Sequence, residues 1–163
     1  MGEMRIMRGT SIAQPQSSVK STHPSILEID SWMPSQIQAI SPLVDRLMLL
    51  IEGSQCVLGE EHGVEIAIRE ALANAVVHGN QRAGEIKVHV RCRCGPGNEI
   101  SIVVTDRGKG FDFRNITGDG PPWQPTGEPG RGIQLMKAYM DDVYFERGGT
   151  EVHMRKRARN SLR

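Results

Sequence analysis

Three polar residues spaced four apart give the strongest chemical signal in the chain. Glu70, Asn74 and His78 lie at i, i+4 and i+8 of the apolar segment 65–80. Residues at this spacing share one face of an α-helix, and a helix this apolar is typically buried. A buried carboxylate, amide and imidazole are costly unless partners satisfy them, so the stripe predicts a polar ligand with a metal ion. Three satisfied core residues, or a stripe that faces water, would explain the same spacing.

A glycine turn after a predicted strand gives a second candidate site. Asp106 ends the apolar segment 99–106, and Gly108 and Gly110 follow it. A carboxylate at the end of a buried strand can accept a hydrogen bond from an exocyclic amine such as that of adenine, and glycines let a flat base approach the backbone. Such a site rejects analogues that leave its buried groups unpaired. The alternative is a tight turn in which glycine supplies a positive φ.

A second glycine pair opens a predicted helix. Gly130 and Gly132 flank Arg131 at the end of a Gly- and Pro-rich loop, residues 107–132. The free N–H groups and the positive dipole end of a helix N-terminus bind phosphate; the alternative is a simple boundary between loop and helix. Long loops inside compact domains tend to be functional. Together, the three motifs could supply a metal ligand, a group that recognises a base and a phosphate cradle.

Hydrophobic periodicity predicts the elements that position these motifs. The predicted strands are 25–30, 85–92, 99–106, 142–146 and 150–157. The predicted helices are 35–51, 61–78 and 132–140, and Pro42 should kink the first of them. This order predicts an α/β (α+β) two-layer sandwich, in which helices cover one face of a mixed, mostly antiparallel sheet.

The whole-chain properties are those of a small globular protein. The chain has 163 residues, the size of a single domain. We expect a flexible N-terminal tail over residues 1–24, a globular domain over 25–157 and a basic C-terminal tail over 158–163. The net charge of +1 gives no reason to expect direct DNA binding.

Cysteine usage and hydropathy predict a compartment. Cys56, Cys92 and Cys94 form neither an even-numbered framework nor a zinc motif, so we expect reduced thiols. No apolar run approaches the roughly 20 residues of a membrane span. The first residues lack the apolar core of a signal peptide. We therefore expect a cytoplasmic protein with no membrane association.

The order of the motifs resembles the GHKL ATPase superfamily, in which E-x-x-x-N, D-x-G-x-G and G-x-G follow one another. The local sequence is similar to one branch, the bacterial anti-sigma-factor serine/threonine kinases, whose ATP-binding domain is histidine-kinase-like (Bergerat fold). The resemblance covers roughly residues 25–157 and rests on REALANAVVHGN (69–80), DRGKGFDF (106–113) and GRGIQLMKAYMDDVYFERGGTEVHMRK (130–156).

The resemblance implies a role for each motif residue. Glu70 would be the general base for a serine hydroxyl, and Asn74 would coordinate the Mg²⁺ that bridges the ATP phosphates. Asp106 would accept a hydrogen bond from adenine, and for His78 a structural hydrogen bond is the expected role. The remaining expected ATP contacts are Gly108 and Gly110 at the base pocket, Gly130, Arg131, Gly132 and Ile133 around the phosphates, and Thr150 near the adenine.

The resemblance also implies partners and an activity. The expected protein is an ATP-binding anti-sigma regulatory factor that phosphorylates a serine on a STAS-type antagonist (anti-anti-sigma) protein and sequesters a sigma factor. Its relatives tend to be homodimers. Two alternatives stay open: a non-catalytic, nucleotide-gated module that binds a regulator, or a detached ATPase domain of a sensor histidine kinase. The lid, residues 112–130, departs from the family by carrying Pro121, Pro122, Trp123 and Pro125.

Overall fold

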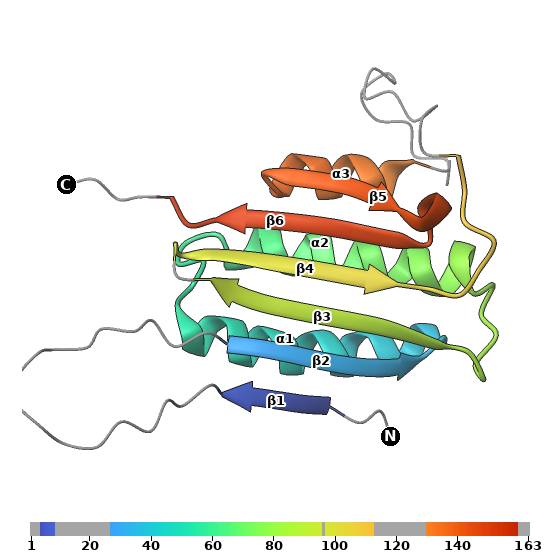
Figure 1. Ribbon diagram of the computed structural model, residues 1–163, viewed down its shortest axis with the longest axis horizontal. Coiled ribbons are helices and arrows are strands. Elements are labelled where there is room, and N and C mark those ends of the chain that lie inside the picture. The colour runs from blue at the N-terminus through green and yellow to red at the C-terminus, as the bar shows by residue number, and fades with distance from the viewer. Residues whose placement is uncertain (1–3, 9–26, 96, 113–129, 160–163) are drawn as a thin grey trace, which may run out of the picture.

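One antiparallel sheet forms the first layer of the protein. The computed structural model describes residues 4–8, 27–95, 97–112 and 130–159 (Figure 1). The described strands pair in the order β1-β2-β3-β4-β6-β5, and every neighbouring pair is antiparallel. Their bounds are β1 (Met4–Arg8), β2 (Leu27–Pro34), β3 (Lys87–Gly95), β4 (Glu99–Thr105), β5 (Asp142–Glu146) and β6 (Glu151–Arg157).

The helices form the second layer, on one face of the sheet (Figure 1). α2 contacts both α1 and α3. This arrangement confirms the predicted two-layer α/β fold with helices on one face. The bounds are α1 (Ile40–Ser54), α2 (Glu61–Asn74) and α3 (Arg131–Tyr139), with short turns η1 (Ile37–Ala39), the π-helix η2 (Ala75–Gly79) and η4 (Arg147–Gly149).

The core lies between the helices and the inner face of the sheet. On β3, Val88 and Val90 are buried, whereas Arg91 and Arg93 are exposed. Successive strand residues face opposite sides, so this alternation directs the apolar side chains toward the helices. The helices complete the core with residues at helical spacing: Leu43, Val44, Leu47 and Ile51 of α1, and Val64, Ala67, Ile68, Ala71 and Leu72 of α2.

The start of the first long helix differs from its prediction. Pro34 ends β2, and α1 begins at Ile40 rather than at the predicted residue 35. Pro42 then lies in the first turn of α1, where backbone N–H groups have no acceptor within the helix. The missing N–H of Pro42 costs nothing there, and α1 continues to Ser54. The kink predicted at Pro42 is therefore wrong.

An edge strand lies within the segment that was predicted to be a tail. Residues Met4–Arg8 form β1 and pair with Leu27–Ser31 of β2. A strand this short is ordered by its ladder hydrogen bonds to a neighbour that lies far along the chain. The hydrophobic pattern of residues 4–8 therefore does not predict that pairing.

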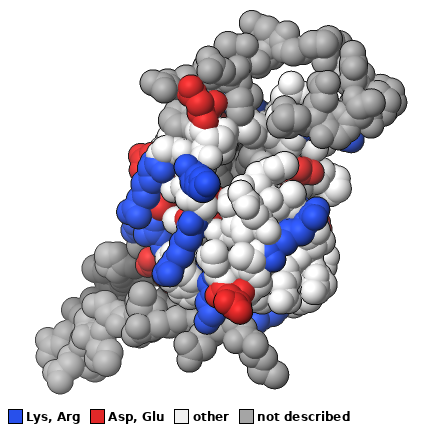
Figure 2. Space-filling model, turned by 90° about the vertical axis from the view of Figure 1, so that its right-hand side faces the viewer, with Lys and Arg blue, Asp and Glu red and all other residues white. Residues whose placement is uncertain are grey.

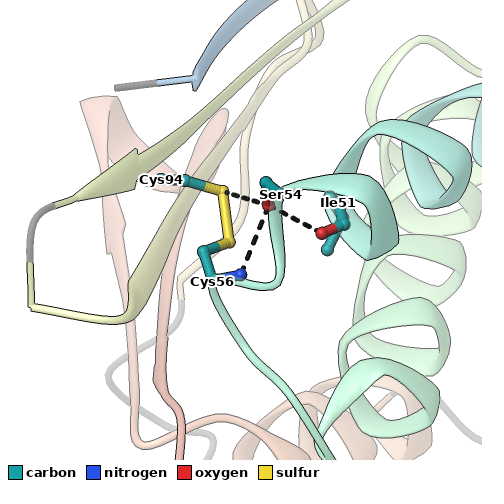
Figure 3. The surroundings of a disulfide bond; sticks show 4 residues. All are labelled: Ile51, Ser54, Cys56 and Cys94. Carbon is teal, nitrogen blue, oxygen red and sulfur yellow. Dashed lines mark hydrogen bonds between the residues drawn. A yellow bond between two sulfur atoms is a disulfide. The ribbon is translucent and has the colours of Figure 1, made fainter. Parts of the chain in front are cut away.

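The prediction of three free thiols is wrong for two of the cysteines (Figure 3). Cys56, which follows α1, and Cys94, on β3, form a disulfide, with Cα atoms 5.9 Å apart. The hydroxyl of Ser54 lies 3.4 Å from the Cys94 sulfur and accepts a 3.3 Å hydrogen bond from the Cys56 N–H. Cys92 remains a free thiol, and burial raises its pKa to about 12.

Several sequence predictions fall outside the described residues. These are the lid prolines and Trp123, most of the N-terminal segment and residues 160–163 of the basic tail. Among the helices that the structure does describe, none has the length and apolarity needed to cross a membrane.

Candidate nucleotide-binding site

A cavity of about 640 Å³ lies between α2, α3, the end of β4 and the segment after β5. The three sequence motifs, far apart in the chain, meet around it. Every predicted site residue except Gly108 lines this cavity: Glu70, Asn74, Asp106, Gly110, Gly130, Arg131, Gly132, Ile133 and Thr150.

The polar stripe of α2 faces this cavity. Glu70 and Asn74 are partly buried, and both line the wall together with His78. His78 is exposed, so the expectation of a buried imidazole is wrong. It lies in the π-helix η2, whose wider turn follows the regular helix that ends at Asn74. The pair Glu70 and Asn74 therefore keeps helical spacing, while His78 belongs to the rim.

The N-terminus of α3 approaches the polar pair closely. A Cβ added at Gly132 would lie 2.8 Å from Glu70 Oε2 and 3.2 Å from Asn74 Nδ2. A side chain at this position would therefore push the ends of Glu70 and Asn74 away from α3. Among the described residues, no side chain caps α3, and the first backbone hydrogen bond of the helix runs from Gln134 N–H to Gly130 O. The preceding N–H groups are therefore available to an anion.

Asp106 also lines the cavity and lies directly after β4. Its Oδ1 accepts a 2.7 Å hydrogen bond from Gly108 N–H, and its own N–H donates to Thr150 O at 2.9 Å. Burial raises the pKa of the Asp106 carboxyl, although the Gly108 hydrogen bond works in the opposite direction. A desolvated carboxylate with one oxygen already bonded is suited to accept a hydrogen bond from a ligand amine.

The two glycines after Asp106 allow backbone segments to touch. A Cβ at Gly108 would overlap Gly79 O, and one at Gly110 would overlap Gly148 O. Gly110 has a φ of +71°, which favours glycine. Gly108 thus shapes the turn against η2 without lining the cavity, whereas Gly110 lines it against η4.

Apart from Ile133, the apolar part of the wall was not predicted from the sequence. Phe111 packs edge-on against Phe145 of β5, with ring centroids 5.1 Å apart, and both line the cavity. Val104 and Met136 line it as well. Aromatic and aliphatic side chains in the same cavity as a carboxylate suit a flat, mostly apolar base. Phe111 stands directly after Gly110, and that proximity is the one sequence signal that could have identified it.

Figure 2 views the end of the molecule at which α2 and β4 end. Lys and Arg side chains gather on the left of this view, toward the open face of the sheet, and the surface to the right is mostly uncharged. The positive surface at this end therefore lies beside the sheet layer rather than over the helices.

The donor set fits a magnesium-bound phosphate group. Mg²⁺ takes oxygen ligands, often one or two from protein and the rest from phosphate and water. The Asn74 amide oxygen and the Glu70 carboxylate face the N-terminus of α3 across the space that a Cβ at Gly132 would fill. An oxygen ligand beside free helix N–H groups is suited to hold phosphate and its counter-ion together.

Comparison with known proteins gives one family match and several named relatives. The model of the histidine kinase-like ATPase domain matches residues 33–156, which include every predicted site residue. The anti-sigma F factor of Clostridium botulinum (strain Eklund 17B / Type B) is 33% identical over 107 residues, covering 61% of this chain and 73% of that protein. The serine-protein kinase RsbW of Bacillus subtilis (strain 168) is 32% identical over 139 residues, covering 77% of this chain and 84% of that protein.

Proposed function

This chain belongs to the histidine kinase-like ATPase domain family, in its anti-sigma kinase branch, and we propose that it binds Mg²⁺–ATP and phosphorylates a serine of a partner protein. Membership in an ATPase family implies ATP as the ligand. The roles of individual residues, the magnesium ion and the partners are the substance of the proposal.

The adenine base occupies the Asp106 side of the cavity. The carboxylate accepts a hydrogen bond from the exocyclic amine, and the wall of Phe111, Phe145 and Val104 contacts the ring. Thr150, whose carbonyl already accepts from Asp106 N–H, lies on the same side. The raised pKa of Asp106 supports this placement, because a desolvated carboxylate gains most from a new donor.

The phosphates occupy the α3 side of the cavity. Asn74 would hold Mg²⁺ through its amide oxygen, and the bound ion would offset phosphate charge. The free N–H groups at Gly130–Ile133 and the Arg131 side chain bind the phosphate oxygens. The closeness of Gly132 to both Glu70 and Asn74 supports this arrangement, because a phosphate at the helix terminus would lie next to both side chains.

Glu70 acts as the general base for phosphoryl transfer. Its carboxylate accepts the proton of the serine hydroxyl, whose oxygen bonds to the γ-phosphorus. The bond from that phosphorus to the bridging oxygen breaks, and its electron pair leaves with ADP. Positioning and electrostatics do most of the work in such reactions, so a single base beside the phosphate site is sufficient chemistry.

The proposal also names the partners of the protein. A STAS-type anti-anti-sigma protein is the proposed serine substrate, and a sigma factor is the proposed binding partner of a homodimeric kinase in the cytoplasm. The relative named anti-sigma F factor supports a sigma factor as the binding partner, and the relative named serine-protein kinase RsbW supports a serine in a protein as the substrate.

The single observation that carries the proposal is the placement of Glu70 and Asn74 against the N-terminus of α3. A phosphotransfer screen with labelled ATP and candidate STAS-type proteins tests it. Wild type should form acid-stable phosphoserine. Glu70→Gln should bind ATP normally while losing about a hundredfold or more of the transfer rate, because general-base catalysis typically contributes 10²–10⁴-fold.

Other results would redirect the assignment. Equal and poor transfer by wild type and Glu70→Gln, with ATP bound by both, would show that Glu70 is not a base and would favour the nucleotide-gated binding module. Acid-labile phosphate on the product would instead point to a histidine acceptor and the detached histidine-kinase domain.

A further inference from the structure

A buried amide joins three separate segments behind the nucleotide cavity. Asn80 directly follows η2, and only 3% of its surface is exposed. Its Nδ2 donates a 2.6 Å hydrogen bond to Ser35 Oγ, and its Oδ1 accepts a 2.8 Å hydrogen bond from Arg107 N–H. Ser35 is fully buried and follows β2, while Arg107 follows Asp106 at the end of β4. The Asn80 side chain therefore connects η2, β2 and the glycine turn.

The backbone around Asn80 is itself held in place. Asn80 N–H donates to Ala75 O at 2.8 Å, and Arg82 N–H donates to Val76 O at the same distance. Ser35 N–H donates to Ile86 O at 3.0 Å. Main-chain hydrogen bonds thus fix the backbone of Asn80 and of Ser35, so the Asn80 Oδ1 atom is held in place as the acceptor for Arg107 N–H.

This acceptor holds the segment that carries the Asp106 carboxylate. Asp106 N–H bonds to Thr150 O, Arg107 N–H bonds to Asn80 Oδ1, and Gly108 N–H bonds to Asp106 Oδ1. Three successive N–H groups are therefore fixed. Gly79 supports the same turn. A Cβ at this position would lie 2.5 Å from Asp106 Oδ2, so a larger residue would displace the carboxylate.

We propose that Asn80 is a positioning residue that sets the selectivity of the site for 6-amino purines. The inference rests on the proposed function, since it assumes that Asp106 accepts a hydrogen bond from the base. A carboxylate attracts the amine of adenine and repels the carbonyl of a 6-oxo purine, but only where its oxygen is held within a few tenths of an ångström. The Asn80–Arg107 hydrogen bond fixes that position.

The test compares two deletions in the same buried network. Asn80→Ala removes the acceptor of Arg107 N–H, and Ser35→Ala removes only the other partner of Asn80. Affinities for ATP and for inosine triphosphate, each with magnesium, are measured by calorimetry. Asn80→Ala should weaken ATP binding about tenfold, the effect of losing one well-placed hydrogen bond, with little change for inosine triphosphate. Ser35→Ala should lower the melting temperature and keep the wild-type ratio of the two affinities.

A second readout keeps the inference testable if Asn80→Ala does not fold. Asn80→Ser is polar and shorter, so its hydroxyl cannot reach Arg107, and it should also lower the affinity ratio. Hydrogen exchange at the Arg107 amide should accelerate in the Asn80 variants and not in Ser35→Ala. The inference is wrong if a folded Asn80 variant keeps the wild-type ratio of ATP to inosine triphosphate affinity, or if Ser35→Ala lowers that ratio equally. Either result would leave the proposed function intact. A wild-type protein that does not bind ATP would overturn the proposed function and this inference with it.

Discussion

Replacement of Gly132 by alanine should separate stability from function. The added Cβ would lie 2.8 Å from Glu70 Oε2, and 3.2 and 3.3 Å from the two terminal atoms of Asn74. These are ends of side chains that can turn away, so the fold tolerates the methyl group. The carboxylate would have to retreat by roughly half an ångström or more to regain normal van der Waals contact.

Gly132→Ala should raise the stability of the protein and lower its rate of phosphotransfer. Alanine is favoured over glycine within a helix by up to about 1 kcal/mol, which raises the melting temperature of a protein of this size by about 2–4 °C at most. Displacement of a catalytic group by about an ångström can cost a hundredfold in rate, so we expect phosphotransfer to fall by about ten- to a hundredfold. Thermal unfolding measures stability, ATP calorimetry measures binding, and the labelled-ATP assay measures phosphotransfer.

Gly53 provides a matched control for this substitution. It lies within α1, and a Cβ there would meet nothing within 4 Å. Gly53→Ala should therefore give a similar gain in stability and leave ATP binding and transfer unchanged. If Gly132→Ala transfers phosphate within twofold of wild type, the close approach of α3 to Glu70 and Asn74 has no functional meaning and the site assignment fails.

Three further predictions concern Asp106 and the disulfide. Asp106→Asn should weaken ATP binding by more than the roughly 1 kcal/mol of an ordinary hydrogen bond, because an amide can present a donor to the adenine amine; unchanged affinity by calorimetry would refute the adenine assignment. Because burial raises the pKa of Asp106, its ionisation opposes folding as the pH rises through that pKa. The same variant should therefore be more stable than wild type at neutral pH without ligand, with the advantage shrinking toward acid pH; an advantage independent of pH would argue against desolvation. Cys56→Ser should lower the unfolding free energy by about 2–4 kcal/mol, since the disulfide closes a loop with a sequence separation of 38, and should abolish any effect of a dithiol on the melting temperature; a variant as stable as oxidised wild type would contradict this.

The residues that line the candidate site could be predicted from the sequence to a large extent. Helical spacing placed Glu70 and Asn74 on one face, and this holds in α2 because helix geometry is local. The glycines of the turn after Asp106 also carried their own signal, since Gly108 and Gly110 lie where backbone meets backbone and a Cβ would overlap it. Phe145 of the apolar wall had no such signal, because apolar residues of the wall and of the core look alike in a sequence.

The sequence by itself determined the element types and the chemical character of each motif, because periodicity, turn residues and helix spacing act over a few neighbouring positions. Only the tertiary structure decided which distant segments meet. It paired β1 with β2, joined Cys56 to Cys94, and placed Asn80 against the N–H of Arg107. Each of these contacts joins chain segments that are brought together by the packing of the whole core. The local pattern of the residues that make such a contact therefore does not predict it.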